Sequence, residues 1–217
     1  MRDVLPGDVG ADVVMVCNSA VRDPAWIEDV KPKVIAFADP VFHYGPSRYA
    51  ATFRSDLQKA VAVSDALVVT TSRYLPLLAR HLPDLLEHAI VLDTHAGSRP
   101  AVPTPDAPSV ATTENVLTLL MLPLAGAMDV DVAVAGCDGR AHGETYFWRH
   151  SRTGQYSDDL METVAQAHPA FFADRHYGDY YATHCKVLDG QISALERSGH
   201  TVRSATPSMI PALAARR

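Results

Sequence analysis

The chain carries near its start the apolar run Asp12-Val-Val-Met-Val-Cys17, which ends at the polar pair Asn18-Ser19. A run this short and this continuous in hydrophobicity is typical of a parallel strand that is buried on both faces. The run Lys33-Val-Ile-Ala-Phe-Ala38 repeats the pattern, and Pro40 prevents that strand from continuing beyond Asp39. These two runs predict the first two strands of a parallel sheet.

Strands and helices are expected to alternate along the rest of the chain. Apolar runs predict further strands at residues 66–70, 89–93, 130–135 and 201–204. Helical periodicity predicts helices at 48–63, 72–81 and 114–127, another that ends near 197, and short helical segments at 21–30 and from 207. Ser47 and Ser72 are expected to cap the first two helices and Thr112 or Thr113 the third, and Pro76 is expected to kink the second. The alternation predicts an α/β fold, with a mostly parallel sheet and helices on both faces.

Two segments lack such periodicity. Residues 95–109 are rich in proline and predict an irregular connection on the surface. Residues 140–178 are rich in aromatic residues, histidine and arginine, and predict a lid-like insertion. We expect the lid to belong to a single domain that spans residues 1–217.

Composition narrows the class of protein. The 217 residues are 47% hydrophobic and 20% charged, and the net charge of −6 argues against a dedicated nucleic-acid binder. The chain has three cysteines, Cys17, Cys137 and Cys185, which lie far apart in the sequence. Their odd number and spacing indicate neither a disulfide scaffold nor a zinc site, and favour a location in the reducing cytoplasm. No apolar run reaches the roughly 18 residues of a membrane span. The first residues also lack the apolar core of a signal peptide.

Short polar side chains follow several predicted strands. Ligands bind at the carboxyl ends of parallel strands, which makes the residues after these ends candidates for binding. They are Asn18-Ser19, Asp39, Thr70-Thr71, Asp93 and Asp138-Gly139-Arg140. The three aspartates could bind a divalent metal ion, although an aspartate at such a position is more often a helix cap or a turn residue. The signatures GxGxxG, GxxxxGK[ST], GxSxG and DxD are absent.

The segment from Asp138 to His150 has the highest density of functional side chains. Arg140, Tyr146 and Arg149 lie within it, and Arg and Tyr donors that converge suit a phosphate or a carboxylate. The two aromatic residues after Tyr146 could instead anchor a lid to the core.

His184 lies in the stretch Asp179-Tyr-Tyr-Ala-Thr-His-Cys-Lys-Val-Leu-Asp189. It shares a predicted helix face with the apolar residues Leu188, Ile192 and Leu195. One interpretation is a core histidine with a hydrogen-bond partner. The other is a general base, because an imidazole titrates near pH 6.5 and can accept a proton from a substrate.

Five short motifs follow one another along the chain. They are Val16-Cys17-Asn18, Phe37-Ala-Asp-Pro-Val-Phe42, Thr112-Thr113-Glu114-Asn115, Gly136-Cys137-Asp138 with Arg140 and Tyr146, and Tyr181-Ala-Thr-His184. In the order and spacing of these motifs, and over nearly its whole length, the chain resembles the bacterial sialyltransferases of glycosyltransferase family 42. The chain has Arg140 where the family has a tyrosine and Asp39 where it has an asparagine, and its third motif lacks a glycine. The first strand of the family and its Gly-rich turn have no counterpart here.

The resemblance implies a Rossmann-like fold and the transfer of a sialic acid, or a related nonulosonic or ulosonic acid, from a CMP-activated donor to a glycan acceptor. It implies an inverting reaction without metal or cofactor, with His184 as the general base. It also implies donor contacts from Asn18, Asp39, Thr113, Asp138, Arg140, Tyr146 and Tyr181. Charge alone adds Arg149 or His150 as a partner for the carboxylate of the donor. Such an enzyme would make bacterial surface polysaccharide in the cytoplasm or at the inner face of the membrane.

Two other classes of protein fit the same residues. The missing first strand favours a non-catalytic relative that binds a nucleotide or a sugar. The polar strand ends also fit another Rossmann-like enzyme that acts on a nucleotide or a phosphosugar.

Overall fold

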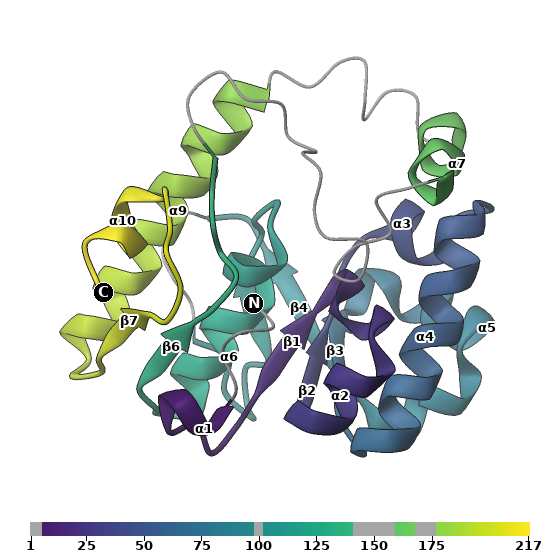
Figure 1. Ribbon diagram of the computed structural model, residues 1–217, viewed down its shortest axis with the longest axis horizontal. Coiled ribbons are helices and arrows are strands. Elements are labelled where there is room, and N and C mark those ends of the chain that lie inside the picture. Colours follow the sequence, from purple (N-terminus) through teal and green to yellow (C-terminus); the bar gives the residue numbers. More distant parts are fainter. Residues whose placement is uncertain (1–5, 98–101, 141–158, 168–176) are drawn as a thin grey trace. The chain divides into compact units, whose positions relative to one another are not determined.

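A computed structural model describes residues 6–97, 102–140, 159–167 and 177–217 (Figure 1). These residues fall into two compact units. The β1–β4 unit holds residues 13–93 and 159–167, and the α9 unit holds residues 6–12, 94–97, 102–140 and 177–217. No helix within these ranges is both long and apolar enough to cross a membrane.

Parallel strands in chain order form the sheet of the β1–β4 unit. They are β1 (Met15–Cys17), β2 (Val34–Ala36), β3 (Leu67–Thr71) and β4 (Ala89–His95), with Val16 opposite Ile35, Ile35 opposite Val68, and Val69 opposite Ile90. The predicted α/β class with a parallel sheet is confirmed. Each connection steps to the next strand in the same direction across the sheet. Helices on both faces stay a prediction.

The helical segments of the β1–β4 unit begin where the sequence supplies caps. They are η1 (Asn18–Arg22), α2 (Pro24–Val30), α3 (Pro40–Tyr44), α4 (Arg48–Ser64), η2 (Ser72–Tyr74), α5 (Leu75–His81), η3 (Pro83–His88) and α7 (Asp159–Ala167). Ser47 caps α4 as predicted, because its hydroxyl accepts a hydrogen bond from the Ala50 N–H at 3.1 Å. The predicted cap at Ser72 and kink at Pro76 are wrong. Ser72 begins the separate turn η2, and α5 starts at Leu75 with Pro76 in its first turn, where proline is tolerated.

The α9 unit has a sheet of its own. Its elements are α1 (Pro6–Val9), β5 (Ser109–Ala111), η4 (Leu117–Met121), α6 (Leu122–Ala127), β6 (Val132–Val134), α9 (Tyr177–Arg197), β7 (Val202–Ser204) and α10 (Pro211–Ala214). Strand β6 pairs with β7 in a parallel two-stranded sheet, and not with the strands of the β1–β4 unit. The last two residues of β4 belong to this unit. Strand β5 follows β4 in the strand order of the larger sheet. Sequence analysis missed β5, which begins at the last residue of the irregular connection expected at 95–109.

Helix α9 supplies the core of its unit. Leu188, Ile192 and Leu195 form one buried face of α9, as the periodicity predicts. They pack with β6, with β7 and with the segment after β7, where Ile210 is 2% exposed. Helix α9 begins four residues before Tyr181, so His184 lies within the helix and not at its start.

The apolar helix predicted at 114–127 is interrupted. Its first turns form the π-helix η4, in which the Leu122 N–H donates to the Leu117 carbonyl five residues earlier. The next residue, Pro123, has no N–H to give to the carbonyl of Thr118. The side chain of Gln191 on α9 donates to that carbonyl instead, at 2.6 Å. Neither predicted threonine caps the segment, because the side chain of Asn115 accepts the Leu117 N–H at 2.9 Å.

A neutral histidine lies in the core of the β1–β4 unit. The His43 ring stacks on Phe53 with centroids 4.2 Å apart and meets the edge of Phe37 at 5.4 Å. Its Nδ1 accepts the Asp39 N–H at 3.0 Å, which requires that nitrogen to be unprotonated. Burial lowers the pKa of His43 from 6.5 to about 3.

This histidine should make stability fall at acid pH. Its folded pKa lies below its unfolded pKa, so between pH 6.5 and 3 the unfolded chain binds the proton and the folded chain does not. The free energy of unfolding should fall by about 2 kcal/mol from pH 8 to pH 5 through this group. In urea titrations, His43→Phe should be less stable at pH 8, because it leaves the Asp39 N–H unpaired, but should lose less stability on acidification. An equal acid loss in both proteins would contradict the assignment.

Candidate functional site

A tight loop follows β6 and places Arg140. In this segment, residues 135–140 (the Arg140 loop), Gly136 and Gly139 have φ angles of +73° and +70°, which residues with side chains rarely adopt. A Cβ atom on Gly139 would lie 2.8 Å from the Tyr181 hydroxyl and 2.7 Å from the Ile210 side chain. The close approach of the loop to α9 therefore requires glycine at position 139.

The Arg140 loop brings Arg140 against Tyr181, although the two residues are 41 positions apart. The Arg140 N–H donates to the Tyr181 hydroxyl at 3.2 Å. The Arg140 guanidinium carbon lies 4.8 Å from the centre of the Tyr181 ring, within the range of a cation–π interaction. Arg140 is only 8% exposed, so this positive charge is held in the protein rather than in solvent. Sequence analysis proposed both residues for one anion, and the structure brings the two together.

The Tyr181 hydroxyl keeps its proton at neutral pH. Burial raises the pKa of Tyr181, so the phenol accepts the Arg140 N–H and can still donate its own hydrogen. Cys185 lies one helical turn later on α9. Burial raises the pKa of the Cys185 thiol as well. Sequence analysis missed Cys185, because a lone cysteine without metal-ligand spacing gives no indication of a site.

His184 lies three residues after Tyr181, on the same side of α9. It is half-buried, and burial lowers the pKa of its imidazole, which keeps the ring neutral at pH 7. Its Nδ1 is buried and has no hydrogen bond to any of the described residues. A core histidine would be expected to have such a partner. The structure thus leaves the His184 imidazole neutral, with a buried ring nitrogen that makes no hydrogen bond to a described residue.

Two more predicted donor contacts lie in the α9 unit. The Thr113 hydroxyl is 2.9 Å from that of Thr118 and 3.3 Å from the carbonyl of Asn115, so it stabilises the start of η4. Asp138 is exposed in the Arg140 loop, and its carbonyl accepts the Met209 N–H at 2.7 Å.

Asn18 and Asp39 belong to the β1–β4 unit, each directly after a strand end or close to it. Asn18 follows β1 with a φ of +49°, and its side-chain oxygen is buried without a hydrogen bond in the described part of the chain. The Asp39 carboxylate accepts the N–H groups of Val41 and Phe42 at 2.8 and 2.7 Å. Asp39 therefore caps α3, which is the alternative that sequence analysis left open for an aspartate at a strand end.

The remaining predictions have different outcomes. Tyr146, Arg149 and His150 lie outside the described residues, as does most of the predicted lid. Within that lid, α7 is described, and its Thr163 hydroxyl accepts the Tyr49 N–H at the start of α4. Among the residues that the structure describes, no three His, Cys, Asp or Glu side chains are grouped so that they could hold a metal ion.

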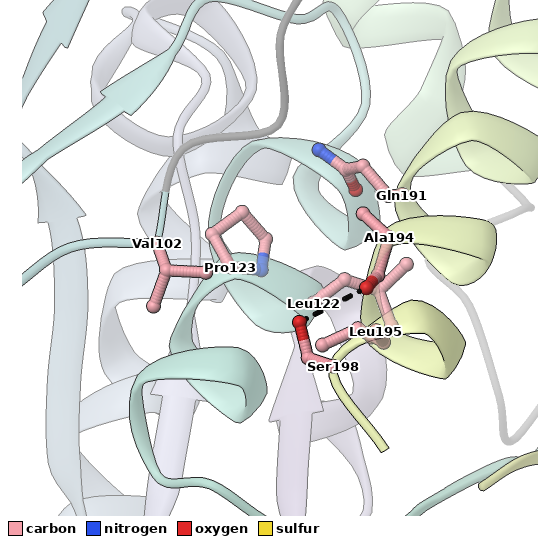
Figure 2. Close-up of a pocket in the computed structure, with 7 residues that line it drawn as sticks. All are labelled: Val102, Leu122, Pro123, Gln191, Ala194, Leu195 and Ser198. Atoms are coloured by element: carbon pink, nitrogen blue, oxygen red, sulfur yellow. Dashed lines mark hydrogen bonds between the residues drawn. The ribbon is translucent and has the colours of Figure 1, made fainter. Parts of the chain in front are cut away.

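A small cavity lies between α6 and α9, apart from the Arg140 loop. Figure 2 shows its lining, with side chains of α6 and of the last turns of α9 around one space. The residues are Val102, Leu122, Pro123, Gln191, Ala194, Leu195 and Ser198. The lining is mostly aliphatic and includes no residue of the predicted site. The amide nitrogen of Gln191 donates to η4, and its buried amide oxygen has no hydrogen bond among the described residues. The Arg140–Tyr181–His184 cluster is therefore the stronger candidate for chemistry.

Comparisons of the chain with protein-family models, with curated proteins and with solved structures found no match. The candidate site therefore rests on the geometry of its own side chains.

Two glycine substitutions should have opposite effects on stability. Gly139→Ala combines a left-handed backbone with a steric clash and should lower the free energy of unfolding by roughly 2–4 kcal/mol. Gly190→Ala lies on an exposed part of α9 with open space around the added methyl, and should raise it by about 0.5–1 kcal/mol. Urea titrations of both variants test this. A neutral Gly139→Ala would show that the loop does not approach Tyr181 as described.

Proposed function

We propose that the chain is a glycosyltransferase that moves a sialic acid, or a related nonulosonic or ulosonic acid, from a CMP-activated donor to a hydroxyl of a glycan acceptor. The observation that carries the proposal is the cluster of Arg140, Tyr181 and His184 in the α9 unit. A buried cation and a phenol that keeps its proton contact each other after the end of β6, and a neutral imidazole lies three residues after that phenol on α9. That is a set of groups suited to a phosphate leaving group and to a hydroxyl that must lose a proton.

In this proposal the two anion donors act on the phosphate of the donor. As the bond between the anomeric carbon and the phosphate oxygen breaks, negative charge builds up on the departing CMP. The Arg140 guanidinium and the Tyr181 hydroxyl are fixed by each other, so they need little reorganisation as that charge develops. Tyr146 is proposed as a further donor to the same phosphate.

His184 is proposed to take the proton of the acceptor hydroxyl as its oxygen attacks the anomeric carbon from the face opposite to CMP. The anomeric configuration is thereby inverted. Burial favours the neutral imidazole, which is the form that can accept a proton.

Replacement of His184 should separate catalysis from binding. His184→Ala should lower turnover of the CMP-activated donor by on the order of 100-fold or more, with the Kd of CMP nearly unchanged. Lys186→Ala, an exposed neighbour on α9, should leave both quantities at their original values. Turnover and calorimetric CMP binding are the measurements. A His184→Ala protein with full activity would exclude His184 as the base.

The pH dependence of turnover should reflect the burial of His184. A lowered pKa keeps the imidazole unprotonated below the ordinary value of 6.5, so activity should persist into mildly acid solution. We expect the acid limb of kcat/KM to have its midpoint below pH 6.5, and to be lost in His184→Ala. A midpoint above 6.5 would contradict a base that is desolvated without a partner.

A protein that binds a nucleotide without transferring a sugar is the second candidate. Nδ1 of His184 has no partner among the described residues that would orient the ring, as catalytic histidines usually have. A thermal-shift panel of CMP, UMP, AMP and GMP, followed by assays of transfer and donor hydrolysis, separates the candidates. CMP binding without either reaction favours the second candidate, and preference for another nucleotide favours a different Rossmann-like enzyme.

A further inference from the structure

The Arg140 loop is held in place by a segment about 70 residues later in the chain. Strands β6 and β7 are parallel, and the pairing of their main chains continues one step beyond them, where the Ala205 N–H donates to the Val134 carbonyl at 2.8 Å. Beyond that hydrogen bond, side-chain hydroxyl groups also bond to the main chain of the loop. The Gly136 N–H donates to the Thr206 side-chain oxygen at 2.9 Å. Residues 205–210 (the clamp segment) thus extend alongside the Arg140 loop.

Ser208 is the central contact of the clamp segment. Its hydroxyl donates to the Cys137 carbonyl at 2.7 Å and accepts the Ile210 N–H at 3.1 Å. The next residue, Met209, donates its N–H to the Asp138 carbonyl at 2.7 Å. One hydroxyl therefore joins the Arg140 loop to the residue before α10.

Ile210 carries this connection into the core. It is 2% exposed and packs in the cluster formed by α9, β6 and β7. Its side chain and its nitrogen are also the atoms that a Cβ on Gly139 would meet, at 2.7 and 3.0 Å. The loop is therefore enclosed by Tyr181 on one side and by Ile210 on another, and Ser208 fixes the distance between the loop and Ile210.

We propose that Ser208 is a positioning residue of the phosphate site, because its hydroxyl holds the Arg140 loop so that Arg140 lies over Tyr181. This inference rests on the proposed function for its ligand, the phosphate of a cytidine nucleotide. Ser208 does not itself contact the ligand. Ser208 instead positions the loop that carries the Arg140 N–H and guanidinium. Its hydroxyl bonds to two backbone groups, which restricts the movement of the loop relative to Ile210.

The test compares Ser208→Ala with Ser208→Thr, which keeps the hydroxyl. NMR hydrogen exchange at the Arg140 amide reports loop position without any ligand, and calorimetry with CMP reports the site. Ser208→Ala should speed Arg140 exchange by about tenfold and weaken CMP binding by about 5- to 10-fold, the effect of losing one hydrogen bond. Ser208→Thr should restore both. In steady state, the KM of the CMP-activated donor should rise in step with the Kd.

A matched control lies in the same unit. The Ser198 hydroxyl bonds to the Ala194 carbonyl at the end of α9, at 3.2 Å, so Ser198→Ala removes a comparable bond away from the loop. It should change neither exchange at Arg140 nor CMP binding. Thr206→Val removes the hydroxyl that accepts the Gly136 N–H. Like Ser208→Ala, it should speed exchange at Arg140 and weaken CMP binding, and it replaces Ser208→Ala in the test if that variant does not fold.

The outcomes distinguish this inference from the proposed function. Faster Arg140 exchange together with weaker CMP binding supports the inference. Unchanged exchange, or unchanged CMP affinity in a variant whose loop has loosened, overturns it. A natural chain that does not bind CMP contradicts the proposed function instead, and the exchange comparison then still decides whether Ser208 holds Arg140.

Discussion

The closeness of the Arg140 loop to α9 is the constraint on which the candidate site depends. The loop can reach the Tyr181 hydroxyl only because Gly139 has no Cβ and adopts a positive φ. That approach gives the buried Arg140 two contacts with one tyrosine, a hydrogen bond to its backbone and a ring beneath its charge. Moving a guanidinium out of water costs free energy unless polar groups in the protein compensate for the lost hydration. The position of Arg140 therefore depends on the loop, on Tyr181 and on the clamp segment that contacts the loop.

Burial is the main cause of the pKa shifts of the histidines His184 and His43, which lie in different units, and of Tyr181 and Cys185. In the α9 unit it keeps Tyr181 and Cys185 protonated and His184 neutral. In the β1–β4 unit it lowers the pKa of His43 to about 3. The two histidines differ in their hydrogen bonds, since Nδ1 of His43 accepts the Asp39 N–H whereas Nδ1 of His184 has no partner in the described ranges. The Asp39 N–H therefore orients the ring of His43, and no described residue orients the ring of His184 through Nδ1.

Several polar side chains form hydrogen bonds with backbone groups that have no partner within their own helical segment. Pro123 leaves the Thr118 carbonyl without its donor, and Gln191 supplies one. The start of α3 leaves N–H groups that Asp39 accepts. Each of these side chains has a polar function that requires no ligand. Arg140 and Tyr181 are different, because their contact joins segments that lie 41 residues apart in the chain.

The sequence by itself determined the elements that depend on local patterns. Apolar runs predict the parallel strands β1 to β4, and Ser47 and the face of Leu188 predict α4 and the inner side of α9, because capping and periodicity act over a few residues. Only the tertiary structure decided that β6 pairs with β7 apart from the larger sheet, that Gln191 donates to the carbonyl of Thr118, and that Ser208 contacts the Arg140 loop. The pairing of β6 with β7 and the packing of the loop on α9 join segments that lie about 40 to 70 residues apart in the chain. The free energy of such contacts cannot be predicted from the pattern of neighbouring residues.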